Sequence, residues 1–371
     1  MVTETRLSSE QLYFSCDPEL LPFKTTSTLE PFTGFFGQNR AIEAMEFGIG
    51  MRRPGYNLFV MGTPHTGRFS FAMENLKAVA KKEKTPKDWI YLNNLQDNRH
   101  PLAISFPAGK AQSFKRDIKQ IIEGALSEMP AAFESPTYQR KKSKIERDFN
   151  RYYDRAIDAV EREAREHSIA VYRDAGTIGF TPVADGQAMD EAVFSQLSED
   201  ARDAFTKAIS ELEDQLNEAL TGLPQWRREA AEKLKNLDRD TTREAISPLF
   251  QPIREKYANL SAAMDYLAEM ETSLVKNCSE IVGDDKVLEP VTDAARRSYM
   301  ESNYGVNLLV DNIKTKGAPV VYEAHPSYEN LFGRVEYNTE MGALSTNYKL
   351  IRSGALHQAN GGYLVMEAEK L

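Results

Sequence analysis

The stretch that decides the fold class is Tyr56-Asn-Leu-Phe-Val-Met-Gly-Thr-Pro-His-Thr-Gly-Arg-Phe-Ser70. An apolar run predicts a strand over Tyr56–Met61, which leads into Gly62-x-x-x-x-Gly67 and then into a helical pattern over Phe69–Ala80. This order is typical of a P-loop, where backbone N–H groups and a helix N-terminus face the phosphates of a nucleotide. The alternative is a glycine-rich turn between strand and helix that holds no ligand.

Two positions of this loop depart from the P-loop pattern. Arg68 stands where Lys normally reaches the β- and γ-phosphates, and Phe69 stands where a Ser or Thr hydroxyl normally holds Mg²⁺. The guanidinium of Arg can still bind phosphate oxygens, whereas Phe offers no oxygen to a metal. The loop is therefore compatible with ATP as a ligand, but we expect Mg²⁺-assisted hydrolysis to be weak or absent. The candidate nucleotide-binding residues are Gly62, Thr63, Pro64, His65, Thr66, Gly67, Arg68, Phe69 and Glu367.

The segment Tyr363-Leu-Val-Met-Glu367 supplies the second half of this candidate site. An acid at the end of an apolar strand downstream of a P-loop indicates the Walker-B element, which orients Mg²⁺. Here Glu367 replaces the usual Asp, and Ala368 replaces the Glu that polarises water. Glu369 is offset by one position and is expected to point elsewhere on a strand. Both halves of the ATPase site are thus incomplete. His65 is either a phosphate contact or a solvent-facing residue.

Length and composition exclude several classes of protein. The 371 residues, 41% of them hydrophobic and 27% charged, leave room for two or three domains. No apolar run approaches the ~20 residues that span a bilayer, and the N-terminus lacks a signal-peptide pattern. Two distant cysteines, Cys16 and Cys278, indicate neither a disulfide framework nor a zinc site, which favours the cytoplasm. The net charge of −9 argues against a nucleic-acid partner, and Arg140-Lys-Lys-Ser-Lys144 is interpreted as a solvated helix face.

Patterning predicts an α/β fold whose parallel sheet core is interrupted by a long helical insertion. Strands are expected at 89–92, 102–106, 306–310 and 318–322, and helices at 41–51 and 347–353; strands that alternate with helices favour a parallel sheet covered on both faces. The expected divisions are a lead-in (1–36), the first part of the core (37–110), the insertion (111–303) with a β-hairpin island (169–194), and the second part of the core (304–371).

Heptad spacing in the insertion predicts coiled-coil packing. The positions of three runs step by three and four, and all but Glu271 are apolar: Ile145, Phe149, Tyr152, Ala156 and Ala159; Phe205, Ile209, Leu212, Leu216, Ala219 and Leu223; and Ile253, Tyr257, Leu260, Met264, Leu267, Glu271, Leu274, Cys278 and Ile281. Interruptions are expected at Pro224, Pro248 and Pro252, so that several helices fold back on each other. The insertion is either a spacer or lid, or an arm that captures substrate.

Several motifs in a fixed order resemble the Lon-related AAA+ proteases over essentially the whole chain. They are Phe35-Phe-Gly-Gln-Asn-Arg-Ala-Ile-Glu-Ala-Met-Glu-Phe-Gly-Ile49, the loop Gly62–Ser70, Asn330-Leu-Phe-Gly-Arg334, and Gly354-Ala-Leu-His-Gln-Ala-Asn-Gly-Gly-Tyr-Leu-Val-Met-Glu-Ala368. The group includes the archaeal membrane-type Lon and bacterial relatives without ATPase activity. The resemblance implies a P-loop AAA+ core in a hexameric, self-compartmentalised serine protease. The Ser–Lys dyad of that family lies in a C-terminal domain, so no residue of this chain is assigned to catalysis, and the sequence is interpreted as an N-terminal fragment.

The resemblance also implies a function: recognising unfolded polypeptides and delivering them to the Ser–Lys peptidase domain. Tyr337 and Met341, on a candidate pore loop between Gly333 and Gly342, are the residues expected to grip substrate, unless both pack back on the sheet. His357 is expected to pack or to end a helix, and no metal site is expected.

Two other readings stay open. One is a nucleotide-independent scaffold or oligomerisation module. The other is a P-loop ATPase of the chromosome-maintenance type, which also places a coiled coil between its two nucleotide motifs. That class requires an LSGGQ-like signature before Walker B, and the sequence contains none.

Overall fold

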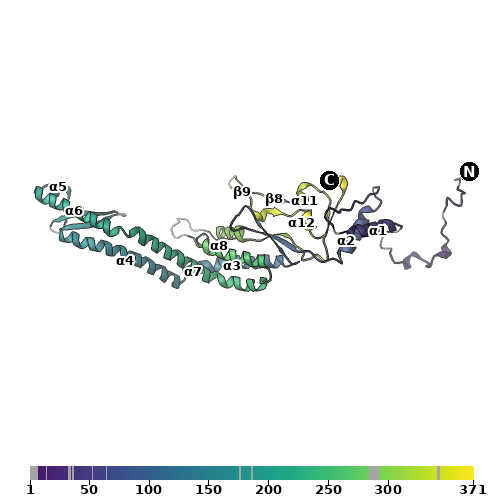
Figure 1. The fold of residues 1–371 in the computed structure, drawn as a ribbon, viewed down its shortest axis with the longest axis horizontal. Helices are drawn as coiled ribbons and strands as arrows, with labels where there is room; N and C mark the ends of the chain where they lie inside the picture. The colour runs from purple at the N-terminus through teal and green to yellow at the C-terminus, as the bar shows by residue number, and fades with distance from the viewer. Residues whose placement is uncertain are drawn as a thin grey trace.

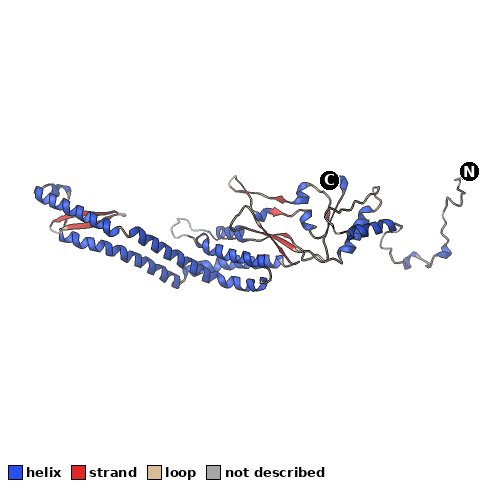
Figure 2. Ribbon diagram, in the orientation of Figure 1, coloured by secondary structure: helices blue, strands red, loops and turns tan. Residues whose placement is uncertain are grey.

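The computed structural model describes the chain except for residues 1–6, 14, 32–34, 36, 52, 64, 175–176, 185–186, 284–291 and 341–342. The molecule is elongated (Figure 1). A helical arm forms one end, a mixed body lies in the middle, and the N-terminal segment extends from the other end. Figure 2 shows that helix predominates and that the strands form small, separate sheets. The fold is thus α/β, as predicted, but without a large sheet.

The helices are unevenly long, and those of the arm are the longest. Their bounds are α1 (Asn39–Gly50), α2 (Arg68–Ala80), α3 (Ala111–Glu134), α4 (Pro136–Glu166), α5 (Glu191–Ser195), α6 (Glu199–Leu220), α7 (Leu223–Tyr257), α8 (Ser261–Lys276), α9 (Cys278–Val282), α10 (Asp293–Tyr304), α11 (Tyr328–Phe332) and α12 (Ala355–Gln358). Short 3₁₀ helices cover Pro18–Leu20, Thr26–Thr28, Tyr348–Leu350 and Ala368–Lys370.

The strands are short and pair mainly antiparallel. They are β1 (Asp88–Leu92), β2 (Leu102–Phe106), β3 (Ile169–Asp174), β4 (Thr177–Ala184), β5 (Gln187–Ala188), β6 (Asn307–Val310), β7 (Val320–Glu323), β8 (Arg334–Val335), β9 (Asn338–Glu340), β10 (Ala343–Ser345), β11 (Ile351–Arg352) and β12 (Tyr363–Met366). Only β7 and β12 form a parallel pair among the described strands, with Val365 opposite Tyr322 and Met366 opposite Glu323. The predicted parallel sheet core is therefore present only as this pair.

The largest hydrophobic core lies under the sheet β2-β1-β6. It joins that sheet to α3, α7, α8, α9 and α10, and its fully buried members include Phe106, Phe114 and Phe250. The strands predicted at 89–92, 102–106 and 306–310 are all present here. Their pairing is antiparallel, however, and the prediction of a parallel sheet was wrong for them. The residues between β1 and β2 are too few for the crossover of a dozen or more residues that a parallel pair needs.

The arm has a second core of its own. Ile157, Val160 and Ala164 of α4 pack against Leu212 and Leu216 of α6, and Ile169 of β3 closes the cluster. Nearer the body, α4 packs along α7, where the Tyr152 and Trp226 rings stack 5.9 Å apart. The predicted heptads in α4 and α6 thus lie on helices that fold back on each other, and the hairpin island is present as β3-β4-β5.

Prolines do not break the helices where the sequence predicted. Pro224 starts α7 as expected, but Pro248 and Pro252 lie inside it. They are four residues apart on the exposed face, so the hydrogen bonds that they remove belong to carbonyls near water. Burial of Ile246, Phe250 and other apolar residues on the opposite face holds the helix together. The chain instead reverses after α7, before α8 begins at Ser261.

A third, smaller core joins α1 and α2 to the parallel pair. Met45, Phe71 and Leu76 are its buried centre, and Val320 and Val365 pack against it from β7 and β12. The helices predicted at 41–51 and 69–80 are present as α1 and α2, and the strands predicted at 318–322 and 363–367 as β7 and β12. This core positions the candidate nucleotide loop.

The predicted strand Tyr56–Met61 does not form. Its residues pair with no neighbour in the described chain, and all of them are exposed, with Met61 79% accessible. An apolar, β-prone run becomes a strand only when a neighbouring strand satisfies its backbone groups. The predicted short helix at 347–353 is also wrong: a 3₁₀ turn over Tyr348–Leu350 leads directly into β11. None of the described helices is both long and apolar enough to cross a bilayer.

Candidate functional site

The candidate nucleotide loop has the backbone layout of its prediction after residue 61. Gly67 is the N-cap of α2 with a φ of 81°, a value that L-residues with side chains rarely adopt. The Thr66 hydroxyl donates to the Thr63 carbonyl oxygen at 2.8 Å and tightens the turn. Gly62, His65 and the other described loop residues up to Gly67 are exposed, and Pro64 lies outside the described residues. The loop is therefore open, and His65 is exposed.

Arg68 does not project into the loop. Its Nη1 donates to the Gly62 carbonyl oxygen at 2.8 Å, and its Nη2 lies 3.0 Å from Glu369 Oε1. Glu369 was expected to point elsewhere, and that prediction was wrong. The strand β12 ends at Met366, and the 3₁₀ helix over Ala368–Lys370 turns Glu369 back towards Arg68. The cation that would meet a phosphate is therefore already paired.

Phe69 and Glu367 meet through a residue that the sequence did not single out, Tyr322. The Phe69 and Tyr322 rings lie 4.6 Å apart in an edge-on contact, and the Tyr322 hydroxyl donates to Glu367 Oε1 at 2.5 Å. The parallel register explains the contact, because Tyr322 is opposite Val365 and Glu367 is two residues further along the same face. Lys370 Nζ lies 3.0 Å from the other oxygen of Glu367.

The hydrogen bonds of this cluster shift the pKa values of its members. The bond from Tyr322, and then that from Lys370, hold the pKa of Glu367 below its usual value. The same bonds to Glu367 raise the pKa of Tyr322 and that of Lys370. We call Arg68, Phe69, Tyr322, Glu367, Glu369 and Lys370 the closed cluster.

The closed cluster does not fit a Mg²⁺–nucleotide. Phe69 gives the metal no oxygen, and both oxygens of Glu367 are engaged by Tyr322 and Lys370. In the part of the chain that the structure describes, no three His, Cys, Asp or Glu side chains come together as metal ligands. A divalent cation would have to compete with Lys370 and Tyr322 for the oxygens of Glu367.

The candidate pore loop is a β-hairpin, β9–β10, that stands on a polar clamp. At its base Glu336 accepts hydrogen bonds from Arg352 Nε at 2.7 Å and from Arg334 Nη2 at 3.0 Å. These bonds, that from Arg352 first, lower the pKa of Glu336, so its carboxylate stays charged. The Glu336 backbone also pairs with the Leu350 carbonyl oxygen. The clamp fixes where the hairpin leaves the body.

Apolar side chains of this region face solvent. Tyr337, the predicted grip residue, is 60% exposed, and Leu344 on the second strand is 73% exposed. Met341, the other predicted residue, lies outside the described residues. The sequence analysis missed a second exposed pair on α11, Tyr328 and Phe332, whose rings are 4.8 Å apart. Tyr328 and Phe332 are four residues apart, and this spacing on a helix predicts that the two rings lie on the same face.

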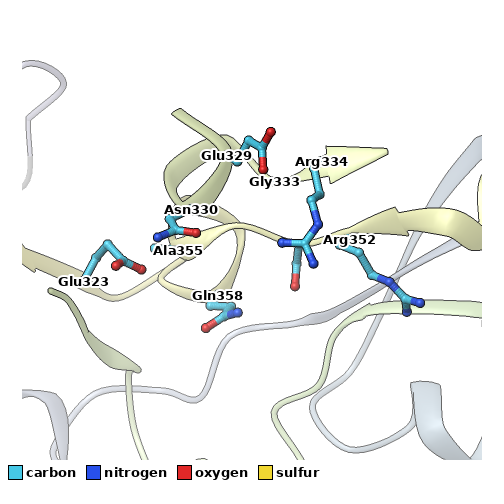
Figure 3. Close-up of a pocket in the computed structure, with 9 residues that line it drawn as sticks. Glu323, Glu329, Asn330, Gly333, Arg334, Arg352, Ala355 and Gln358 are labelled. Atoms are coloured by element: carbon cyan, nitrogen blue, oxygen red, sulfur yellow. The ribbon is translucent and has the colours of Figure 1, made fainter. Parts of the chain in front are cut away.

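Two hollows lie beside the hairpin base. One, of about 150 Å³, is polar and is lined at one side by Glu323, Asn330 and Gln358 and at the other by Arg334 and Arg352 (Figure 3). Its mixed charge does not favour a polyphosphate. The other is larger and mainly apolar, and Phe332 and Leu356 face Trp89 and Tyr91 across it. Phe332 thus connects the exposed pair of α11 with an apolar groove.

His357 has a local structural role. Its Nδ1 accepts a hydrogen bond from the Gly354 backbone N–H at 3.2 Å, at the start of α12. This confirms the prediction that His357 belongs to a helix end. Cys16 is exposed and Cys278 is partly buried, and both are free thiols.

Comparison with models of protein families gives two matches, each to one segment of the chain. Residues 316–371, which include β7, the hairpin and β12, match the model described as "LonB-like, AAA domain". Residues 88–121, which include β1, β2 and the first half of α3, match the model described as "Lon-like LonC helical domain". No curated protein matches the chain. Both matches are to domains of Lon proteins, and neither is to a peptidase domain. Two segments of the chain are therefore similar to domains of Lon-related proteins, one of the AAA type and one helical.

Proposed function

We propose that this chain is the AAA+-like, substrate-handling portion of a Lon-type serine protease, which recognises unfolded polypeptides and delivers them to a C-terminal Ser–Lys peptidase domain. The two family matches support a substrate-handling role of the Lon kind. The observation that carries the proposal is the exposed apolar surface of the hairpin region, formed by Tyr328, Phe332, Tyr337 and Leu344. Exposed apolar side chains of this density mark binding surfaces for other chains.

The shape of this surface suits an extended polypeptide. Tyr337 and Leu344 stand on a hairpin that the Glu336 clamp holds away from the body. Phe332 continues the apolar surface into the groove that Trp89, Tyr91 and Leu356 line. An unfolded chain presents apolar side chains and free backbone N–H and C=O groups. The neighbouring polar hollow contains carboxylates and guanidinium groups that can hydrogen-bond these backbone groups. Met341 is retained in the proposal as a further grip residue.

The closed cluster supports the second part of the proposal, that ATP hydrolysis is weak or absent. The P-loop AAA+ core is kept here as a framework in which a nucleotide would have to compete with Glu369 for Arg68. Gly62, Thr63, Pro64, His65, Thr66 and Gly67 remain the proposed phosphate contacts for any ATP that binds without Mg²⁺. The same cluster also favours the alternative of a nucleotide-independent scaffold, which differs in not binding unfolded chains.

We further propose a cytoplasmic homo-oligomer, a hexameric ring in the full-length protein, without a membrane or nucleic-acid partner. The division of the chain into lead-in, interrupted core and helical insertion is likewise a proposal. The packing of β1 and β2 on α3 favours starting the helical unit at Asp88, ahead of the boundary at 110/111 that the sequence suggested.

The hairpin makes a direct test of substrate handling. The double variant Tyr337→Ala, Leu344→Ala is expected to bind a fluorescently labelled, permanently unfolded polypeptide roughly tenfold more weakly, because two exposed apolar contacts are lost. Fluorescence anisotropy measures the affinity. The control is Tyr13→Ala, which removes an exposed Tyr from the N-terminal segment. Equal affinity of the variant and the unmodified chain, or no binding at all, would favour the scaffold alternative.

The nucleotide loop is tested separately. We expect no phosphate release from ATP above the protein-free rate, and no enhancement of ATP binding by Mg²⁺ in calorimetric titrations, because Glu367 is held by Tyr322 and Lys370. Tight, Mg²⁺-dependent binding with turnover would refute this part of the proposal and leave the hairpin's role untouched.

A further inference from the structure

The outer face of the sheet β2-β1-β6 carries aromatic side chains where polar ones are usual. Along β1, Ile90 and Leu92 are buried in the large core, so the alternating residues Trp89 and Tyr91 lie on the opposite face of the sheet. An antiparallel sheet that packs on a core with one face commonly presents polar residues on the other. A Trp and a Tyr side by side on that second face are therefore an exception to the pattern.

These two rings belong to the mainly apolar groove beside the hairpin base, which has a volume of about 390 Å³. Ala103 lies opposite Tyr91 on β2 and is exposed, so its short side chain leaves space beside the Tyr91 ring. Phe332 of α11 and Leu356 of α12, both exposed, line the groove across from the sheet. Ligand pockets commonly have volumes of ~300–1,000 Å³, so the groove has room for one bulky group.

The groove has a polar end, formed by His357 and Asn360. His357 Nδ1 accepts the hydrogen bond from the Gly354 N–H, so the proton of the neutral ring is on Nε2. Within the described chain, neither His357 Nε2 nor the Asn360 side-chain amide has a hydrogen-bond partner. The imidazole thus offers one donor, and the amide offers donors and an acceptor. A peptide unit, with one C=O and one N–H, matches this pair.

The lining of the groove excludes charged guests. Among the described residues that line it, none is Asp, Glu, Lys or Arg. A charged side chain entering it would lose water without gaining an ion pair, which costs free energy. The smaller hollow, to which α11 and α12 also contribute, contains Glu323, Arg334 and Arg352 instead. The two hollows therefore accept different side chains, and the larger one suits uncharged, apolar groups.

We propose that the groove binds one large, uncharged side chain of an unfolded polypeptide, aromatic in preference to aliphatic, and that the adjoining peptide unit hydrogen-bonds His357 and Asn360. Trp89, Tyr91 and Phe332 offer ring faces and edges to an aromatic guest. Phe332 also contacts the ring of Tyr328, so the groove continues the exposed apolar surface of the hairpin region. The inference rests on the proposed handling of unfolded chains and adds a residue preference to it.

Trp89 reports directly on the occupancy of the groove. The chain has two tryptophans, and Trp226→Phe leaves Trp89 as the only one. The probes are acetylated and amidated pentapeptides in which one Phe, Leu, Ala or Glu is flanked by glycines. The Phe peptide should shift the Trp89 emission to shorter wavelength, because the indole loses water. It should bind at least tenfold more tightly than the Ala or Glu peptide, with the Leu peptide between them.

Two variants of this single-tryptophan chain separate the two halves of the proposal. Ala103→Phe fills the groove with a ring and should lower the affinity for the Phe peptide to that for the Ala peptide. Ala108→Phe makes the same change at an exposed position outside the groove and should leave both affinities unchanged. Asn360→Ala should weaken the Phe and Ala peptides alike, roughly threefold to tenfold, because it removes a contact with the backbone and not with the side chain.

The peptide series decides the proposal even if a variant fails to fold, which circular dichroism would show. Equal affinities for the four peptides, or a Trp89 emission that none of them changes, would overturn it. An Asn360→Ala variant with unchanged affinities would overturn the recognition of the peptide unit. A Trp89 emission that shifts on dilution without peptide would overturn the proposal by assigning the groove to a second copy of the chain.

The hairpin test and the groove test can fail separately. If Tyr337→Ala, Leu344→Ala leaves the binding of an unfolded polypeptide unchanged while the Phe peptide still binds beside Trp89, the role of the hairpin is wrong and the groove site stands. If the hairpin variant binds the polypeptide more weakly but the peptides show no preference at Trp89, the groove site is wrong and the role of the hairpin stands.

Discussion

Replacing Asp88 by Ala is expected to lower the free energy of unfolding by about 2–5 kcal/mol, because it leaves two buried N–H groups without an acceptor. Asp88 is fully buried at the start of β1. One of its carboxylate oxygens accepts from the Ala111 N–H at 3.1 Å, at the first residue of α3, and the other accepts from the Asn312 N–H at 2.9 Å, just after β6. One side chain thus ties together three segments that are distant in sequence.

Urea unfolding followed by circular dichroism measures the effect. Asp88→Asn keeps one acceptor oxygen and should lose about half as much stability. Asp311→Ala is the control: Asp311 accepts a single bond from the Ile313 N–H at an exposed position, and its loss should cost less than ~1 kcal/mol. An Asp88→Ala variant as stable as the unmodified chain would mean that water or a neighbouring group replaces the carboxylate.

Phe250→Ala is expected to destabilise the body by ~3–5 kcal/mol without loosening the outer arm. Phe250 is fully buried in the large core under the sheet β2-β1-β6. The arm has its own core around Ile157 and Leu212, which shares no buried residue with the first. Because local stability follows local packing, the two regions should lose protection independently.

Native-state hydrogen exchange separates the two regions. In Phe250→Ala, amides of α3, α7 and α8 should exchange faster, while those of α6 should keep their rates. The reciprocal variant, Ile157→Ala, removes a fully buried side chain of the arm and should show the opposite pattern. Equal acceleration in both regions for either variant would show that the body and the arm unfold as one unit.

The sequence predicted most elements of this fold, because their signals are local. The amphipathic patterns of α1, α2, α4 and α6 and the apolar runs of β1, β2, β6, β7 and β12 are all present. Pairing was harder. The short link between β1 and β2 excluded a parallel crossover, and that signal was overlooked. For Tyr56–Met61 the apolar composition alone indicated a strand. A strand also needs a neighbouring strand to pair with, and no local sequence pattern reveals whether one is present.

The sequence shows the parts of the candidate site but not the contacts between them. The departures at Phe69 and Ala368 are visible in the sequence alone, and the loss of metal-binding chemistry that they indicate stays a prediction. What replaced that chemistry depends on tertiary contacts: Tyr322 comes from another strand, and Glu369 is brought round by a 3₁₀ turn after β12. The sequence analysis treated Glu369 as part of the strand and therefore predicted that the Glu369 side chain points away from the site. In the structure β12 ends at Met366. Only the strand register and the end of β12 reveal the closed cluster.

The exposed run Tyr56–Met61 has a consequence for handling the protein. Phe59 and Met61 are more than 70% accessible, so this segment is a sticky patch that favours aggregation at high concentration. Apolar association of this kind is strengthened by salting-out salts such as sulfate. A preparation whose particle size rises as ammonium sulfate is added would be reporting this patch.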